Sequence, residues 1–179
     1  MWLCHKNVTK QQDAPRTVFL PAKTVQQVAA LPFVPLSGGI EVMLITSRHG
    51  GRWLLPKGWP SGKNAFADDA AREAREEAGI VGAVHRDPVG EYTYDKVMSA
   101  GYRVRSHVFV YPLLIREHRL DWPERDERDA RWAGLAEASG LVGDRDLAKL
   151  LNQLAQTGRD ALHRAAVQLD AIPTTTAAC

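Results

Sequence analysis

The segment 56–80 constrains the fold of this chain more than any other stretch, because it combines a punctuated loop with a strongly patterned helix. Pro56 and Gly58 predict the loop, since both residue types interrupt regular structure. Asn64 can accept backbone hydrogen bonds as the N-cap of the helix that follows it. Gly79 predicts the end of that helix, because glycine enters the left-handed conformation beyond a helix terminus at little cost.

On a helical wheel of about 100° per residue, this helix has two distinct faces. One face is acidic and carries Asp69, Glu73, Glu76 and Glu77. The other face is lined by alanines, at Ala67, Ala70, Ala71, Ala74 and Ala78. The alanine face lets the helix lie close against a sheet, whereas like charges four residues apart on the acidic face repel each other. A divalent cation would relieve that repulsion, and Mg²⁺ prefers oxygen ligands while keeping waters for a phosphate substrate.

An ordinary solvated helix is the alternative explanation of the acidic face. Arg72 lies four residues from both Asp68 and Glu76, a spacing at which opposite charges stabilise a helix without any ligand. The order of the residues favours a functional site instead, because the segment resembles the Nudix box, G-x5-E-x7-R-E-U-x-E-E-x-G-U, where U is a bulky or apolar residue. The match consists of Gly58, Arg72, Glu73, Glu76, Glu77, Gly79 and Ile80.

Two positions of the segment differ from the usual box. Ala74 is a small occupant of the first U position, and Asn64 stands where the box has glutamate. That glutamate is peripheral to the metal cluster in many members, so Asn64 bears on the number and affinity of metal ions more than on the fold. The resemblance implies an α/β fold, an α/β/α sandwich with a mixed sheet and the box helix packed on it.

The resemblance also implies a reaction, in which water attacks phosphorus and a phosphoanhydride bond is cleaved with Mg²⁺ as cofactor and Mn²⁺ as a substitute. Glu73, Glu76 and Glu77 are expected to bind the metal and to be catalytic, and the Gly58 carbonyl is expected to be a further ligand. Arg72 has no acceptor atom, so its expected role is to orient a box carboxylate. The general base is left open between Glu73 and three carboxylates of a later loop, Glu124, Asp126 and Glu127.

Basic residues in the segments expected around the box are candidates for binding substrate phosphates, since arginine suits bidentate contact with phosphate. These candidates are Arg48, Arg52, Lys57, Lys63, Arg103 and Arg105. Among the five tryptophans, only Trp59 and Trp122 fall in expected loops where a base could stack. His49, His85 and His107 are expected to be surface or packing residues rather than ligands.

Within the Nudix family, the chain is most similar to the diphosphoinositol polyphosphate and diadenosine polyphosphate phosphohydrolase branch. The motifs that carry this likeness are Ser47-Arg48-His49 with Arg52-Trp53, Tyr102-Arg103-Val104, and Asp121-Trp122 with Arg131-Trp132. Trp59 departs from the branch, because many relatives have glycine at that position. The likeness implies a polyphosphorylated small-molecule substrate, either a nucleoside or an inositol polyphosphate.

The remaining patterns predict one domain, 24–170, between a polar N-terminal arm, 1–23, and a tail, 171–179, that is expected to be disordered. Strands are expected at 25–36, 40–46, 53–55, 80–95, 102–115 and 131–133, and further helices at 135–139, 144–156 and 159–169. Pro32 and Pro35 are expected to interrupt the first strand late. Strands on both sides of a central helix, followed by helices, also fit a layered α/β/α sandwich.

Composition narrows the classes of partner. The net charge of +2 gives no general field for polyanions, which argues against nucleic acid and against an RNA-end pyrophosphohydrolase. No apolar run approaches the ~20 residues of a membrane helix, and the first residues lack the apolar core of a secretory signal. Cys4 and Cys179 form no disulfide framework, which fits a cytoplasmic protein. A non-catalytic Nudix-fold binding or sensor domain stays an alternative to the hydrolase, and the oligomeric state is left open.

Overall fold

The structure, a computed structural model, describes four ranges of the chain: 24–48, 51–62, 65–97 and 101–171. The predicted arm, 1–23, lies outside these ranges, and so does the predicted tail except for Ala171. Three residues singled out in the sequence also fall outside them, namely His49, Lys63 and Asn64. The predicted domain boundaries stay predictions, although the described helices and strands run from Thr24 to Asp170.

The described elements follow the predicted order, except that a short strand at Lys57–Gly58 lies where a loop was predicted. The strands are β1 (Thr24–Leu36), β2 (Gly39–Thr46), β3 (Trp53–Leu54), β4 (Lys57–Gly58), β5 (Ile80–Val84), β6 (Gly90–Val97), β7 (Arg103–His118) and β8 (Ala130–Gly134). The α-helices are α1 (Phe66–Ala78), α2 (Leu135–Leu141), α3 (Arg145–Gln153) and α4 (Arg159–Asp170). A short 3₁₀ turn covers Arg125–Glu127, and a π-helical segment covers Leu154–Gly158.

All eight strands form one mixed sheet around a parallel pair, β1 and β7. These two strands run together from Thr24 opposite Arg105 to Phe33 opposite Leu114. Each of them has two antiparallel outer partners at different points of its length. Strand β1 pairs first with β4 and later with β2, and strand β7 pairs first with β6 and later with β5.

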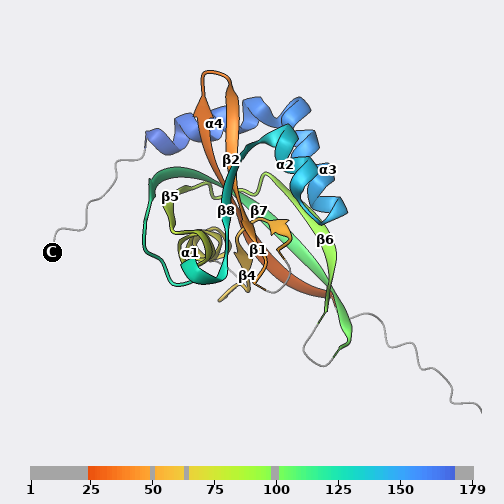
Figure 1. The fold of residues 1–179 in the computed structure, drawn as a ribbon. Helices are drawn as coiled ribbons and strands as arrows, with labels where there is room; N and C mark the ends of the chain where they lie inside the picture. Colours follow the sequence, from red (N-terminus) through yellow and green to blue (C-terminus); the bar gives the residue numbers. More distant parts are fainter. Residues whose placement is uncertain (1–23, 49–50, 63–64, 98–100, 172–179) are drawn as a thin grey trace, which may run out of the picture.

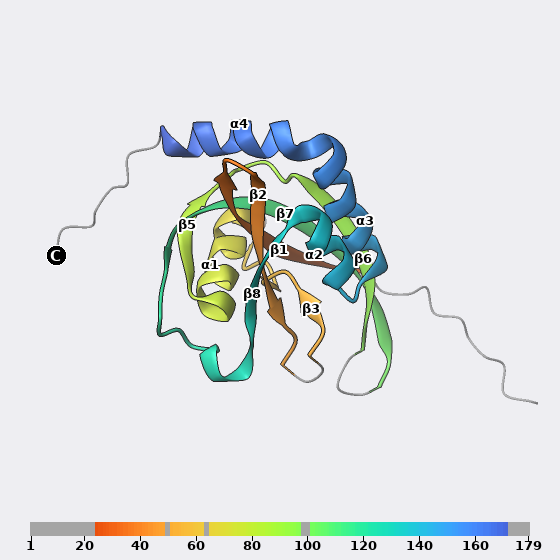
Figure 2. The same cartoon turned by 45° about the horizontal axis from the view of Figure 1, so that its top comes forward.

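The two faces of the sheet carry separate hydrophobic cores. On one face the buried alanines of α1 pack against β1 and β2, on side chains such as Val28 and Met43. On the other face α2, α3 and α4 build a larger core with Leu31, Phe33 and Val110. Figures 1 and 2 show α1 on one side of the strands and α2 and α3 on the other. The predicted α/β/α sandwich with a mixed sheet is therefore confirmed.

The prolines of the first strand do not interrupt it, contrary to the prediction. Strand β1 continues through Pro32, which faces Leu113, and through Pro35, which faces Ile40. Pairing with β4 ends before Pro32 and pairing with β2 begins after it, while pairing with β7 ends before Pro35. Each proline therefore has a strand on one side only, and its missing N–H group costs no ladder hydrogen bond.

Three further boundaries differ from the sequence prediction. The region 80–95 contains two strands, because β5 and β6 pair with opposite ends of β7. Strand β7 extends beyond the predicted end at residue 115 to His118. The segment Thr157-Gly158 was expected to interrupt the last helices, but it belongs to the π-helical segment that joins α3 to α4.

Helix α1 ends as predicted and begins one residue later than expected. Gly79 adopts a left-handed conformation (φ 67°), and its N–H group donates to carbonyl oxygens of the last turn. Ala65, which has no capping side chain, occupies the N-cap position predicted for Asn64. Among the described helices, none is both long and apolar enough to cross a membrane.

Gly82 marks a bulge where β5 pairs with β7, and it provides a test of this packing. A Cβ at Gly82 would overlap the Leu114 carbonyl oxygen, a backbone atom that cannot rotate away. We expect Gly82→Ala to lower the free energy of unfolding by ~1–3 kcal/mol in urea titrations, as overpacking does. Gly140→Ala is the matched control, because a Cβ there meets no atom within 4 Å. Equal effects of the two substitutions would contradict the proposed overlap.

Candidate active site

The acidic face of α1 is organised by Arg72. Its guanidinium lies 2.9 Å from Glu73 and 3.2 Å from Glu76, and 3.6 Å from Asp69 one turn earlier. Burial raises the pKa of Glu73 above the usual value for glutamate, although the charge of Arg72 opposes the shift. The arginine therefore balances a set of carboxylates that would otherwise repel one another, and its role in orienting a box carboxylate stays a prediction.

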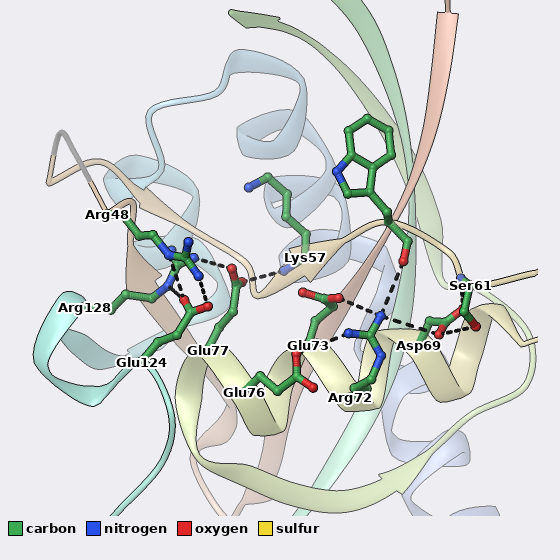
Figure 3. A network of polar contacts seen from close by, with 11 residues as sticks. Arg48, Lys57, Ser61, Asp69, Arg72, Glu73, Glu76, Glu77, Glu124 and Arg128 are labelled. Atoms are coloured by element: carbon green, nitrogen blue, oxygen red, sulfur yellow. Dashed lines mark hydrogen bonds and ion pairs between the residues drawn. The ribbon is translucent and has the colours of Figure 1, made fainter. Parts of the chain in front are cut away.

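The loop before α1 is fastened to the helix at three points (Figure 3). The backbone amides of Lys57 and Ser61 donate to the carboxylates of Glu77 (2.9 Å) and Asp69 (2.7 Å). The Trp59 carbonyl oxygen accepts from the Arg72 guanidinium at 3.4 Å. Because the anchoring side chains lie on successive turns of one helix, the loop follows the acidic face along its length. Its backbone is thereby fixed beside the box carboxylates.

Glu77 belongs to a second ion-pair network, which reaches the loop before β8. Arg128 contacts both Glu77 and Glu124, and it also donates to the Thr46 carbonyl oxygen at 2.9 Å. Arg48 contacts Glu124 from the other side and lies 2.9 Å from Glu127. Burial raises the pKa of Glu77, and Arg128 opposes that shift. Burial would also raise the pKa of Glu124, but hydrogen bonds from Arg48 and Arg128 outweigh burial and lower it.

A cavity of about 400 Å³ opens between β3, β6 and the start of α3. Its basic lining residues are Arg52, Lys57, Lys96 and Arg103, and its aromatic ones are Trp53, Tyr92 and Tyr94. Asp95 and Asp144 also line it, but two amides of α3 already occupy the Asp144 carboxylate. Lys57 connects the cavity to the box, because its amide binds Glu77 while its Nζ lies 5.7 Å from the Tyr94 ring centroid.

The structure brings only part of the predicted phosphate-binding set together. Arg52, Lys57 and Arg103 line the cavity. Arg105 does not line it and instead pairs with Asp95 at 3.2 Å on the surface. Arg48 is engaged by two glutamates of the later loop, so its charge is already partly balanced. Lys63 lies outside the described residues.

Trp122 lies in a loop, as predicted, and packs against the end of α1. A Cβ on Gly79 would overlap its indole, and the His118 ring lies 5.5 Å from it. The stacking of a base on Trp122 stays a prediction. The two described histidines of the sequence analysis contact protein side chains. His107 pairs with Glu91 at 3.0 Å, and His85 contacts Gln168.

The chemistry of the box face suits a hard divalent cation. Glu73, Glu76 and Glu77 offer carboxylate oxygens, and Gly58 offers a backbone carbonyl. A Cβ at Gly58 would overlap the Glu73 carboxylate and make it turn away, so glycine allows this carboxylate to lie against the loop backbone. Across the described ranges, no three Asp, Glu, His or Cys side chains gather as a ready-made metal cluster. Glu73 and Glu76 pair with Arg72, whereas Glu77 pairs with Arg128. The assignment of these groups as metal ligands stays a prediction.

Two residues of the site were missed by the sequence analysis. Arg128 lies inside a charged run that reads as solvated, yet its side chain is only 8% exposed and joins two glutamates. Lys96 lies near the end of β6 and was not among the predicted phosphate-binding residues, yet it lines the cavity. Neither residue belongs to a periodic pattern, so only the folded arrangement identifies them.

The ion pair between Arg128 and Glu77 is testable through stability. Arg128→Ala leaves the 9% exposed Glu77 side chain without its guanidinium partner, and we expect a loss of about 3–5 kcal/mol in urea unfolding. The double variant Arg128→Met with Glu77→Gln should recover much of this loss, because no charge stays buried. Arg131→Ala, which removes a half-exposed pair with Glu137, is the control and should cost at most ~1 kcal/mol. A similar loss in both single variants would contradict the assignment.

Comparison with known proteins places these features in a family. The NUDIX domain model matches residues 26–154. Nudix hydrolase 13, mitochondrial, of Arabidopsis thaliana is 30% identical over 115 residues, which cover 60% of this chain and 56% of the relative. Nudix hydrolase 18, mitochondrial, of the same plant is 31% identical over 121 residues, covering 68% and 66%. The match thus spans less than two thirds of the length of either relative.

Solved structures share the fold at low sequence identity. A C. elegans Ap4A hydrolase has a TM-score of 0.54 at 20% identity, covering 74% of this chain and 97% of that one. The NUDIX domain of Shewanella oneidensis NrtR, complexed with ADP ribose, has a TM-score of 0.55 at 18% identity, covering 78% and 89%. Because the family model covers more than two thirds of the 179 residues, including the whole of α1, the chain belongs to the NUDIX domain family, that of the curated Nudix hydrolases.

Proposed function

We propose that this protein is a Mg²⁺-dependent hydrolase that cleaves a phosphoanhydride bond in a polyphosphorylated small molecule, of the diadenosine polyphosphate or diphosphoinositol polyphosphate type. The observation that carries the proposal is the double position of Lys57. Its amide binds the box carboxylate Glu77, and its side chain lines the basic and aromatic cavity. A phosphate chain bound in that cavity would therefore lie beside the box.

Glu73, Glu76, Glu77 and the Gly58 carbonyl are the groups that would hold Mg²⁺, or Mn²⁺ in its place. A bound ion of this kind activates water and neutralises charge on phosphate oxygens. Arg72 and the buried Arg128 keep the carboxylates in position from opposite ends of the acidic face. The fixed loop supplies the glycine carbonyl without a further ordering cost, since helix side chains already hold its backbone.

The cavity lysines suit the binding of an anionic substrate. Burial lowers the pKa of Lys57, and burial likewise lowers the pKa of Lys96. A phosphate beside them would favour their charged forms and offset the desolvation. Arg52 and Arg103 add two cationic groups to the same lining.

The geometry narrows the choice of general base. Glu124 is held by two arginines, Arg48 and Arg128, so it is the least free of these carboxylates to accept a proton from water. Glu127 and Glu73 each pair with one arginine at 2.9 Å, so their ion pairs do not separate them. Asp126 lies on an exposed 3₁₀ turn. Glu73 lies directly against the Gly58 backbone on the acidic face, which makes it the best supported candidate.

Known proteins of this fold support a nucleotide-type substrate. One of them is an Ap4A hydrolase, and another carries ADP ribose. A second function, ligand binding without turnover, makes use of the same cavity but does not need the box carboxylates. Loss of turnover on changing a box carboxylate therefore separates the two functions.

The first test concerns Glu76, because its side chain is the most exposed of the three box glutamates (39%). Glu76→Gln should keep the fold and lower kcat/KM by on the order of 10²-fold, because it removes an anionic ligand. Release of nucleotide or phosphate from Ap4A and from a diphosphoinositol polyphosphate is measured with Mg²⁺ and with EDTA. Glu117→Gln is the control, because this exposed glutamate of β7 pairs with Arg119 and with no described residue of the box. Metal-independent turnover, or an unaffected Glu76 variant, would reject the hydrolase proposal as stated.

The second test compares two arginines of one strand. Arg103 lines the cavity, whereas Arg105 does not line it and has its charge balanced by Asp95. Charge-assisted hydrogen bonds contribute ~1.5–3 kcal/mol, so Arg103→Ala should reduce kcat/KM for a long polyphosphate roughly 10- to 150-fold. Arg105→Ala should leave it within about twofold. If the two variants lose activity equally, the cavity is not where the phosphate chain binds.

A further inference from the structure

Trp59 is the most exposed tryptophan of the described chain, and it stands in a loop that cannot move freely. Its side chain is 44% exposed. Its own carbonyl oxygen accepts from Arg72, and the loop is also held at Lys57 and Ser61 by side chains of α1. The indole is therefore presented to solvent from a fixed backbone beside the box. Rigid aromatic groups of this kind bind at low entropic cost, because little ordering is needed.

Lys96 links this indole to the cavity. It comes from the end of β6, and its Nζ lies over the Trp59 ring, 4.6 Å from the centroid. The same side chain lines the cavity that also contains Lys57 and Arg103. An ammonium can cover only one face of an indole, so the exposed remainder of the ring is open to a second flat group.

We propose that Trp59 and Lys96 form a clamp for the nucleoside end of the substrate, in which Lys96 binds a phosphate in the cavity and Trp59 stacks on the attached base. This inference rests on the proposed function for the place of the phosphate chain, and it chooses between the two substrate types left open there. A nucleobase has a π face that can stack on an indole. An inositol ring has none and gains only the contact with Lys96.

A purely structural contact is the competing explanation. In that case the Trp59–Lys96 pair would only hold the end of β6 against the box loop. Removal of the ring would then disturb the cavity for every ligand alike. Stacking on a base affects only ligands that carry one, which gives the two explanations different consequences.

The test is equilibrium binding by calorimetry, with ADP as the probe that has a base and tripolyphosphate as the probe that has none. Base–aromatic stacking is worth ~1–3 kcal/mol, so Trp59→Ala should weaken ADP binding about 5- to 150-fold and change tripolyphosphate binding less than about twofold. Trp59→Phe should retain most of the ADP affinity. Lys96→Ala should weaken both ligands. Trp132→Ala, which removes the other exposed tryptophan (38%) from β8, is the control and should change neither.

Three results would overturn the clamp: no ADP binding by the unchanged protein, no loss of ADP binding in Trp59→Ala, or an equal loss for both probes. Because the readout is binding, it separates this inference from the proposed hydrolysis. Trp59-dependent ADP binding without turnover of any polyphosphate would remove the hydrolase and support the clamp. If the protein hydrolyses Ap4A but Trp59→Ala binds ADP as tightly as the unchanged protein, the result would support the hydrolase and contradict the clamp.

Discussion

The hydrogen bond from the Lys57 amide to Glu77 is the contact on which the rest of the site depends. It joins the last turn of α1 to β4, and β4 in turn pairs with β1 at the centre of the sheet. This contact fixes the position of the acidic face of α1 relative to strand β4. The same residue sends its side chain into the cavity, so one position sets the distance between the carboxylates and the cationic lining.

Arginines make this concentration of carboxylates compatible with a folded protein. Arg72 balances the exposed end of the acidic face, and Arg128 balances Glu77, which is nearly buried. A buried carboxylate without a partner costs several kcal/mol, so Arg128 is needed as long as Glu77 is charged. The same balance explains why the glutamates turn toward guanidinium groups and do not converge on one another.

The box helix could be predicted because local rules govern it: two distinct faces and a glycine stop at Gly79. The short strand β4 at Gly58 could not, because its partner β1 is distant in the sequence. Long-range arrangement could not be predicted in the same way. Arg103 and Arg105 share a strand face, yet Asp95 on the neighbouring strand pairs with one of them and leaves the other to the cavity. Arg128 reads as part of a solvated charge run until the fold brings Glu77 beside it. In each case the deciding partner lies on another element, and sequence periodicity carries no information about it.

The cavity is lined by residues of β4, β6 and β7 from the half of the sheet that precedes a change of partners along the two central strands. Pro32 on β1 and Pro112 on β7 both lie where one outer neighbour has ended and the next has not begun. Before these prolines the order across the sheet is β4-β1-β7-β6. Lys57 on one outer strand nevertheless approaches Tyr94 on the other, with its Nζ 5.7 Å from the ring centroid. The side chains bridge the distance, since the Tyr94 hydroxyl also reaches Gln27 on β1. Lys57 and Tyr94 both line the cavity, and the chain runs from β4 through the box loop into α1.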